Sequence, residues 1–239
     1  MRAGVFLWRV MKIPFSELNK KEWTLYILSL TVVVGSNLFS DVIDVFNLVS
    51  TVIGVTALIF IAKGNVWGQI FSLLFAVLYG ITSYKSKYYG EVFICVLMTI
   101  PLSIFSIIVW IKNPFEKGKN VVKIKILSFK EVILTIILAS VVTVVFYFIL
   151  QAFNTPNLIV STISICTSFL ASYLMLRRNS YYAIAYTLND IVLIILWTLA
   201  SIENLENLPV VACFSMFLFN DLYAFLRWKA REKEQILTN

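Results

Sequence analysis

The 239-residue chain has no histidine, three cysteines and few charged side chains. The lack of histidine excludes Ser-His-Asp triads, histidine-ligated zinc or haem, and histidine proton relays. Charged residues make up 14% of the chain and hydrophobic residues 60%, whereas a soluble domain carries roughly 25% and 45–50%. Together with a mean hydropathy of +0.87, this composition excludes a water-soluble enzyme and a disordered chain, and it predicts an integral membrane protein.

The three cysteines, Cys95, Cys166 and Cys213, lie far apart in apolar runs and have no C-x-x-C spacing. A free cysteine in such surroundings behaves as a small, unreactive hydrophobic residue. We therefore expect no disulfide, no metal site and no cofactor.

Long apolar runs dominate the rest of the chain. A membrane helix needs about 20 apolar residues to cross the hydrocarbon core. Eight runs approach this length, at 23–40, 42–62, 65–84, 89–111, 131–153, 158–176, 180–200 and 206–226. Their continuous apolar character, without strand-like alternation, predicts helices rather than barrel strands.

The distribution of Lys and Arg predicts how these runs are oriented. With the N-terminus in the cytoplasm, eighteen of the twenty basic residues fall on the cytoplasmic side, and only Lys85 and Lys87 fall outside. This is the positive-inside pattern. It places the basic tail 227–239 in the cytoplasm, and it explains the net charge of +7 without a nucleic-acid partner.

The segment 1–22 mixes basic residues with apolar and aromatic ones. This composition is typical of an amphipathic helix at a membrane surface. No A-x-A cleavage site follows the first apolar run, so we expect the segment to be retained.

A weak internal repeat relates two groups of three runs. Gly64-Asn65 and Asn179-Ser180 open corresponding runs, and superposing Trp110 on Trp228 sets Ser103 opposite Asp221. The groups would be 42–111 and 158–226, with 131–153 as a linking helix and 23–40 as an extra N-terminal helix. One linking helix makes both groups run in the same direction, as in parallel-repeat transporters with a mid-membrane site. The predicted fold is an all-α membrane protein of two parallel three-helix bundles.

Two Asn-Asp pairs lie deep in apolar runs, Asn189-Asp190 and Asn220-Asp221, with no basic residue inside the runs to neutralise them. Such residues mark substrate pathways, although they also bond neighbouring helices to one another. Tyr186 and Tyr223 lie one turn from these pairs and add aromatic rings. Asp221 has an alternative role as an ion-pair partner of Arg227 or Lys229. Glu91, at the start of its run, is expected to face solvent on the outer side.

Other residues of the runs suggest motion, packing or stacking. Pro101, beside Ser103, interrupts a helix and serves either as a hinge or as a static bend. The serines at 161, 164, 168 and 172 fit a helix-packing seam better than a ligand surface. The tryptophans near run ends, including Trp110 and Trp228, fit interfacial belts, with Trp67 and Trp197 as possible stacking partners for a ligand.

The stretches "GNVWGQIFSLLFAVLYGITSYKSKYYGEVF", "IPLSIFSIIVWIKNP" and "LFNDLYAFLRWKAREKE" resemble the PnuC family of vitamin transporters, especially those for nicotinamide riboside. The likeness covers most of 42–233 and includes the three-one-three helix order, a fold related to the SWEET sugar transporters. It implies a multi-pass protein of the bacterial inner membrane.

The resemblance further implies uptake by facilitated diffusion, with alternating access around the mid-membrane site. A cytosolic nucleoside kinase would trap the vitamin by phosphorylation. The family's pocket stacks aromatic rings on the base and holds the ribose and carboxamide with amides. The matching positions here are Asn189, Asp190, Tyr186, Asn220, Tyr223, Thr99 and Ser103.

The chain departs from the family pattern at some of these positions. Related proteins often carry Gln at the position of Ser103 and Trp near Ala183 and Tyr186. Thiamine, riboflavin or a deoxynucleoside therefore stay open as substrates, as does ion-coupled symport through Asp190 or Asp221. A membrane enzyme or an assembly scaffold is the competing class. We expect no enzyme, because no cluster of catalytic groups at one depth is evident.

Overall fold

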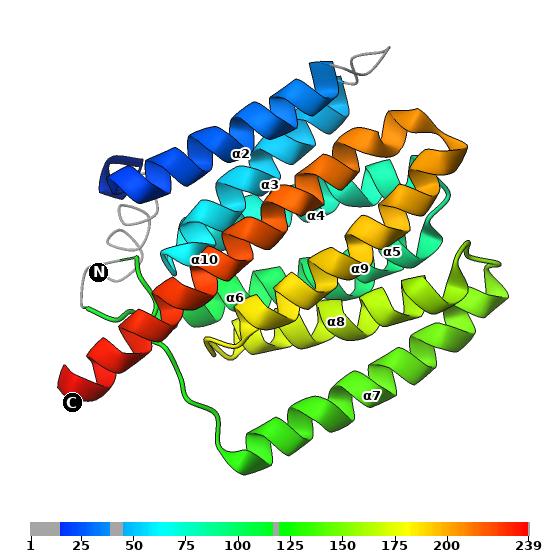
Figure 1. Cartoon of the computed structure of the whole chain (residues 1–239). Coiled ribbons are helices and arrows are strands. Elements are labelled where there is room, and N and C mark those ends of the chain that lie inside the picture. The colour runs from blue at the N-terminus through cyan, green and yellow to red at the C-terminus, as the bar shows by residue number, and fades with distance from the viewer. Residues whose placement is uncertain (1–14, 39–44, 117–119, 239) are drawn as a thin grey trace, which may run out of the picture.

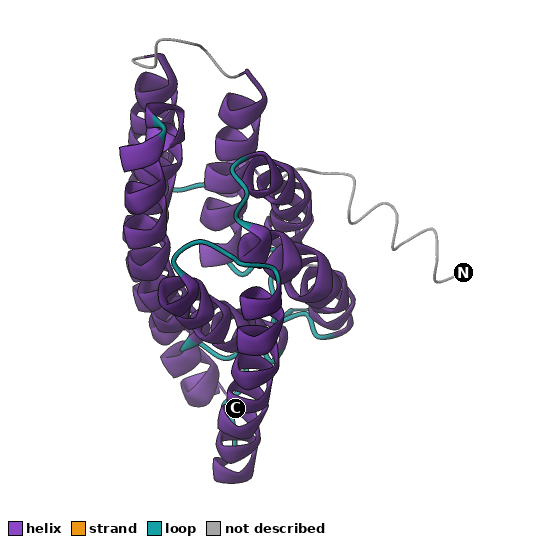
Figure 2. Cartoon of the chain, turned by 90° about the vertical axis from the view of Figure 1, so that its right-hand side faces the viewer, coloured by secondary structure: helices purple, strands orange, loops and turns teal. Residues whose placement is uncertain are grey.

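The computed structural model describes residues 15–38, 45–116 and 120–238, and within them it contains helices and no strand (Figures 1 and 2). The elements are η1 (Phe15–Glu17), α2 (Lys20–Leu38), α3 (Val45–Ala62), α4 (Val66–Lys85), α5 (Tyr89–Phe93), η2 (Ile94–Thr99), α6 (Ile100–Lys112), α7 (Phe129–Ala152), α8 (Leu158–Leu176), α9 (Tyr182–Glu203), η3 (Leu205–Asn207) and α10 (Leu208–Thr238). The amphipathic helix expected over 1–22 lies mostly outside the described residues.

All eight apolar runs are helical where they are described, but the described residues contain seven helices that are long and apolar enough to cross a membrane. These are α3, α4, the continuous helix Tyr89–Lys112, and α7 to α10. The helix α2 is not among them. It begins with Lys20, Lys21 and Glu22, and these charges lower its hydropathy. The chain is therefore a multi-pass helical membrane protein, and α2 does not qualify as an eighth span by length and composition.

Six helices of the described chain pack in a closed ring. Following the contacts, the order is α3, α4, α6, α8, α9 and α10, and α10 packs again on α3. The helix α2 lies outside the ring against α3 and α10, whereas α7 lies outside it against α8 (Figure 1). The two outer helices thus flank the ring on its outside.

The segment between α6 and α7 crosses one end of this ring, which we call the basic end because Lys63, Lys112 and Arg177 lie where α3, α6 and α8 finish. The backbone N–H of Val122 donates to the carbonyl of Gly64, and that of Lys125 donates to the carbonyl of Arg178, both at 2.9 Å.

Gly64 and Arg178 occupy the same position after the ends of α3 and α8. Both have left-handed backbone angles, with φ of 65° and 59°. In the residues that follow, the Oδ1 atoms of Asn65 and Asn179 accept from the backbone N–H two residues on. The structural correspondence therefore pairs Asn65 with Asn179, one residue away from the pairing read from sequence.

The start of α2 is fastened to the ring at the same end. Glu22 is fully buried and forms an ion pair with Lys63 at 3.0 Å. Its other oxygen lies 3.8 Å from Arg227 and accepts from the hydroxyl of Tyr223 at 3.4 Å. Asn19 and Glu22 also exchange hydrogen bonds across the first turn of α2, a capping arrangement that satisfies two free backbone N–H groups. Glu22 is therefore both a helix cap and the anchor of α2.

Two predictions about single residues change in the folded chain. Trp110, Trp197 and Trp228 are at most 1% exposed, so they belong to the core and not to interfacial belts. Pro101 lies in the first turn of α6, directly after the π-helical turn η2. A π turn is a local irregularity that often occurs at functional sites, and here it lies before the proline in the continuous helix.

Candidate functional site

A cavity of about 100 Å³ lies inside the ring and is lined by side chains from all six ring helices. This space has room for several water molecules. Aliphatic and aromatic side chains make up much of the wall. Its polar lining consists of Gln69, Ser72 and Tyr79 from α4, Glu91 from α5, Thr99 from η2, Ser103 from α6, Ser168 and Ser172 from α8, Tyr186, Asn189 and Asp190 from α9, and Asp221 from α10.

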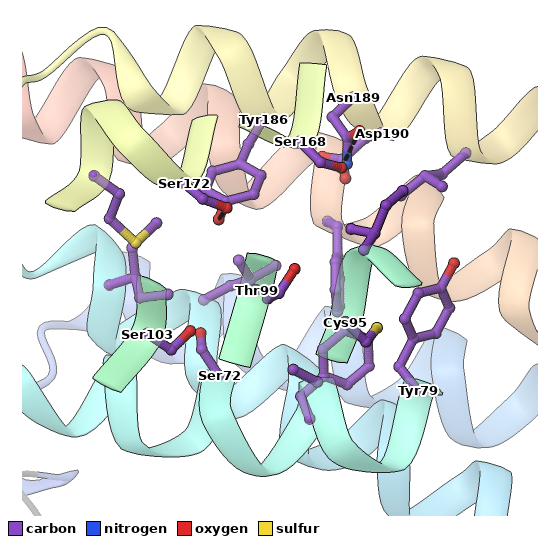
Figure 3. A pocket seen from close by; sticks show the side chains of 18 of the residues that line it. Ser72, Tyr79, Cys95, Thr99, Ser103, Ser168, Ser172, Tyr186, Asn189 and Asp190 are labelled. Atoms are coloured by element: carbon purple, nitrogen blue, oxygen red, sulfur yellow. Dashed lines mark hydrogen bonds between the residues drawn. The ribbon is translucent and has the colours of Figure 1, made fainter. Parts of the chain in front are cut away.

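One wall of the cavity is formed by α9 and α8 (Figure 3). The Oδ1 atom of Asn189 accepts hydrogen bonds from the hydroxyls of Thr167 and Ser168, both at 2.8 Å. This fixes the amide orientation and leaves its NH₂ group without a hydrogen bond to any described residue. The hydroxyl of Tyr186 pairs with that of Ser172 at 3.0 Å. The wall therefore presents an amide donor and an aromatic ring.

The opposite wall carries Thr99, Ser103 and Ser72 (Figure 3). Thr99 and Ser103 are four residues apart, which brings them to one face of a helix. Hydroxyls both donate and accept hydrogen bonds. This wall therefore presents hydroxyl groups that can donate and accept hydrogen bonds.

Glu91 corrects the expectation that it faces solvent. It is 1% exposed and lines the cavity. Its two oxygens accept from the hydroxyls of Tyr79 at 3.2 Å and Ser164 at 2.7 Å, and the Trp197 indole N–H donates to Tyr79 at 2.8 Å. The carboxyl group is buried because α8 and α4 cover the start of α5 and supply these partners.

Asp190 and Asp221 meet in the cavity from α9 and α10. Each is 2% exposed, and their carboxyl groups interact directly. Asp190 Oδ2 and Asp221 Oδ1 are buried and have no hydrogen-bond partner. None of the ion pairs of the described residues includes Asp221, so the alternative pairing with Arg227 or Lys229 is not formed.

Several predicted site residues lie elsewhere. Asn220 faces α2, where its amide donates to Ser29 at 2.9 Å, and Tyr223 reaches Glu22. Trp67 packs beside Phe71 and does not line the cavity. Five of the predicted site residues do line the cavity together: Thr99, Ser103, Tyr186, Asn189 and Asp190. Trp197 stands behind them and supports the wall through Tyr79.

The sequence prediction missed several residues of the cavity: Gln69, Ser72, Tyr79, Glu91, Ser168 and Ser172. Gln69 carried a usable signal, because an amide inside an apolar run is as costly in lipid as the Asn residues that were singled out. The serines of α8 belong both to a packing seam and to the cavity wall, because Ser168 and Ser172 bond residues of α9 while lining the space.

The lining suits an organic solute. Aromatic rings from Phe75, Phe214 and Phe217 pack edge to face around one side, and amide and hydroxyl groups line the rest. The described residues contain no group of three or more His, Cys, Asp or Glu side chains that could hold a metal ion. Apolar surface with a few oriented polar groups is the usual character of a small-molecule site.

Residues 44–230 match the model of the nicotinamide mononucleotide transporter family. The chain is 27% identical over 185 residues to the nicotinamide riboside transporter PnuC of Neisseria mucosa, an alignment covering 75% of this chain and 70% of that protein. PnuC of Haemophilus influenzae is 23% identical over 183 residues, covering 76% and 77%. The crystal structure of the vitamin B3 transporter PnuC is similar in fold, with a TM-score of 0.80 over 91% of this chain and 94% of that one, at 24% identity.

Proposed function

Since the chain belongs to the nicotinamide mononucleotide transporter family, we propose that it takes up nicotinamide riboside across the membrane. The family predicted from the residues is confirmed by this match and by the two PnuC relatives. The observation that carries the proposal is the cavity itself. All six ring helices line it, so a solute bound there lies inside the ring of helices.

Nicotinamide riboside joins a carboxamide-bearing aromatic ring to a sugar. In our proposal the unpaired amide donor of Asn189 bonds the carboxamide, with Gln69 nearby in the same lining. Tyr186 packs against the aromatic ring of the substrate, and Thr99 and Ser103 bond the ribose hydroxyls. Asn220 and Tyr223 act indirectly, by holding α2 against the ring of helices.

We further propose that the helices form two parallel groups, α3 to α6 and α8 to α10, joined by α7 in the three-one-three order of the SWEET fold. Alternating access would then come from the two groups moving about the cavity. Pro101 and the π turn η2 are the proposed hinge, because a helix bends most easily where its hydrogen-bond ladder is irregular. We propose facilitated diffusion without a coupling ion.

The positive-inside pattern supports a cytoplasmic location for the basic end and both termini, in the inner membrane of a bacterium. A cytosolic nucleoside kinase is the proposed functional partner. Phosphorylation adds charge to the arriving vitamin and keeps it inside the cell. The basic residues of 112–130 serve in this proposal chiefly to orient the chain, and described ones such as Lys112 and Lys130 are the candidates for contact with anionic lipid headgroups.

Ligand-binding measurements test which vitamin is the substrate. Purified protein is screened by thermal unfolding against nicotinamide riboside, thiamine, riboflavin and deoxynucleosides, because a ligand of the folded state raises the unfolding temperature. Stabilisation by nicotinamide riboside at the lowest concentration supports the proposal. Preferential stabilisation by another vitamin assigns the chain to the alternative substrates of the family.

Reconstitution tests the mechanism. In proteoliposomes without ion gradients, nicotinamide riboside should equilibrate and not accumulate. Accumulation driven by a sodium or proton gradient contradicts facilitated diffusion and favours symport.

A further inference from the structure

All the Asp, Glu, Lys and Arg side chains in the described cavity lining are acidic. Glu91, Asp190 and Asp221 all contribute side chains to it, and no Lys or Arg does. The ion pairs of the described residues involve none of these three acids. A transporter for an uncharged nucleoside has no need of three acidic side chains without a basic partner in its cavity. Their presence therefore calls for an explanation.

The three acids differ in how well their oxygens are satisfied. Both oxygens of Glu91 accept a hydrogen bond from a hydroxyl, which accounts for that carboxyl group within the protein. Asp190 and Asp221 each keep one buried oxygen without a partner. A buried polar atom without a partner is costly, and the two unpartnered atoms belong to side chains that line the same cavity.

We propose that the carboxyl groups of Asp190 and Asp221 form a cation-binding site, called here the charge-reading site. This site makes the cavity select a substrate with a positively charged aromatic ring. This inference rests on the proposed transport function and concerns what the site discriminates. Two adjacent carboxyl groups out of water favour a cation between them, because opposite charges attract strongly where the dielectric constant is low. The bound cation would supply the interactions that Asp190 Oδ2 and Asp221 Oδ1 lack.

The surroundings favour an organic cation over a metal ion. Metal ions such as Ca²⁺ take six or more oxygen ligands, and the described residues hold no suitable metal-binding group. Aromatic side chains, including Tyr186, Phe214 and Phe217, line the same cavity. Their ring faces attract organic cations. A flat ring that carries its charge within the ring fits both features.

This site divides the candidate substrates by charge. Nicotinamide riboside carries a positive pyridinium ring, because its ring nitrogen bears the sugar, and thiamine carries a positive thiazolium ring. Riboflavin and the deoxynucleosides are uncharged at neutral pH. The acid pair therefore favours the first two substrates and disfavours the others.

The test compares nicotinamide riboside with its 1,4-dihydro form, which has nearly the same shape and no ring charge. Affinities are measured on the purified full-length protein in detergent. We expect the cation to bind about tenfold or more tightly than the neutral form. In D190N and D221N that ratio should fall towards one, because an amide keeps the shape of the carboxyl group and removes its charge.

A control variant, S103A, alters an uncharged residue of the same cavity. It is expected to weaken both ligands and to leave their ratio unchanged. Should an Asp variant fail to fold, the wild-type ratio still decides, because equal affinity for the two forms overturns the proposal. If thiamine is the ligand instead, the comparison uses thiamine and its uncharged oxidation product thiochrome.

The outcomes separate the two hypotheses. Equal binding of charged and uncharged forms refutes the charge-reading site and leaves the transport of nicotinamide riboside standing. Binding of riboflavin or a deoxynucleoside in place of the cations refutes the site as well. Absence of binding by every ligand refutes the proposed function, and this inference with it.

Discussion

Trp110 and Trp228 lie in contact at the basic end of the bundle, with ring centroids 5.6 Å apart and ring planes tilted by 49°, and each bonds the end of another helix in the same way. The Trp110 indole N–H donates to the carbonyl of Met175 at 3.2 Å, and that of Trp228 donates to the carbonyl of Ile61 at 2.9 Å. Both acceptors are the next-to-last residues of their helices, α8 and α3. The two tryptophans superposed in the weak sequence repeat thus occupy matching places.

The first prediction follows from this match. W110F and W228F each remove one indole hydrogen bond and part of a buried ring, while the carbonyls of Met175 and Ile61 keep the backbone N–H groups of Arg178 and Gly64 as donors. Each variant should cost about 1–2 kcal/mol of stability, from the lost hydrogen bond and the lost packing. Thermal unfolding in detergent measures both losses. W23F, at a tryptophan that is 38% exposed, is the control and should change little. A large loss in one of the two buried variants with none in the other would contradict an equivalent role.

The second prediction separates the two Asn-Asp pairs. N189L removes the amide that faces the cavity and should weaken nicotinamide riboside binding about tenfold, as expected for the loss of about one hydrogen bond. N220L removes a contact with Ser29 on α2, and it should lower the unfolding temperature while leaving ligand affinity nearly unchanged. Binding isotherms together with thermal unfolding read both effects. Loss of binding in N220L alone would show that the cavity is not the substrate site.

The third prediction concerns the anchor of α2. E22Q removes the charge that pairs with Lys63, whose side chain is 13% exposed. Breaking a mostly buried ion pair on one side costs about 3 kcal/mol, so the variant should unfold at a clearly lower temperature. The exposed Glu206 provides the control, because E206Q should stay within about 0.5 kcal/mol of the wild type. Equal stability of the two variants would mean that Glu22 does not anchor α2.

The fourth prediction concerns the turn after α3. Gly64 has φ of +65°, and a Cβ atom there would lie 2.6 Å from Arg231 Nη2. G64A should therefore cost about 1–2 kcal/mol, the penalty for a side chain in left-handed backbone, measured by thermal unfolding. G35A lies in α2 with no atom within 4 Å of the new methyl group. It should be neutral or slightly stabilising, since alanine favours helix. A stable G64A variant would show that this turn adjusts freely.

Much of the fold follows from the sequence because each ring helix must satisfy its own backbone hydrogen bonds in lipid. Long apolar runs therefore predict helices. Seven of the eight runs form described helices that are long and apolar enough to cross a membrane. The polar pair Asn189-Asp190 was found for the same reason, since lipid tolerates such residues only where they face protein or water. Its place on the cavity wall agrees with that prediction.

The direction of each polar side chain depended on packing. Asn220 and Asp221 are neighbours in sequence, yet Asn220 faces α2 and Asp221 faces the cavity. Successive residues of an α-helix point about 100° apart, because a turn contains about 3.6 residues. Their environments are then set by which helix lies on each side of α10. Glu91 is a second side chain whose environment depends on packing, because one of its buried oxygens accepts from Ser164 on α8, a helix far from it in sequence.

The amino-acid sequence alone determined that this protein is embedded in a membrane and which segments of the chain form its helices. It also determined which polar side chains are too costly to expose to lipid. The tertiary structure alone decided which of those side chains meet. The joining of Asp190 to Asp221 across α9 and α10 and the closure of six helices around one cavity are contacts between residues far apart in sequence. Such contacts depend on how helix faces fit together, and hydropathy does not encode that fit.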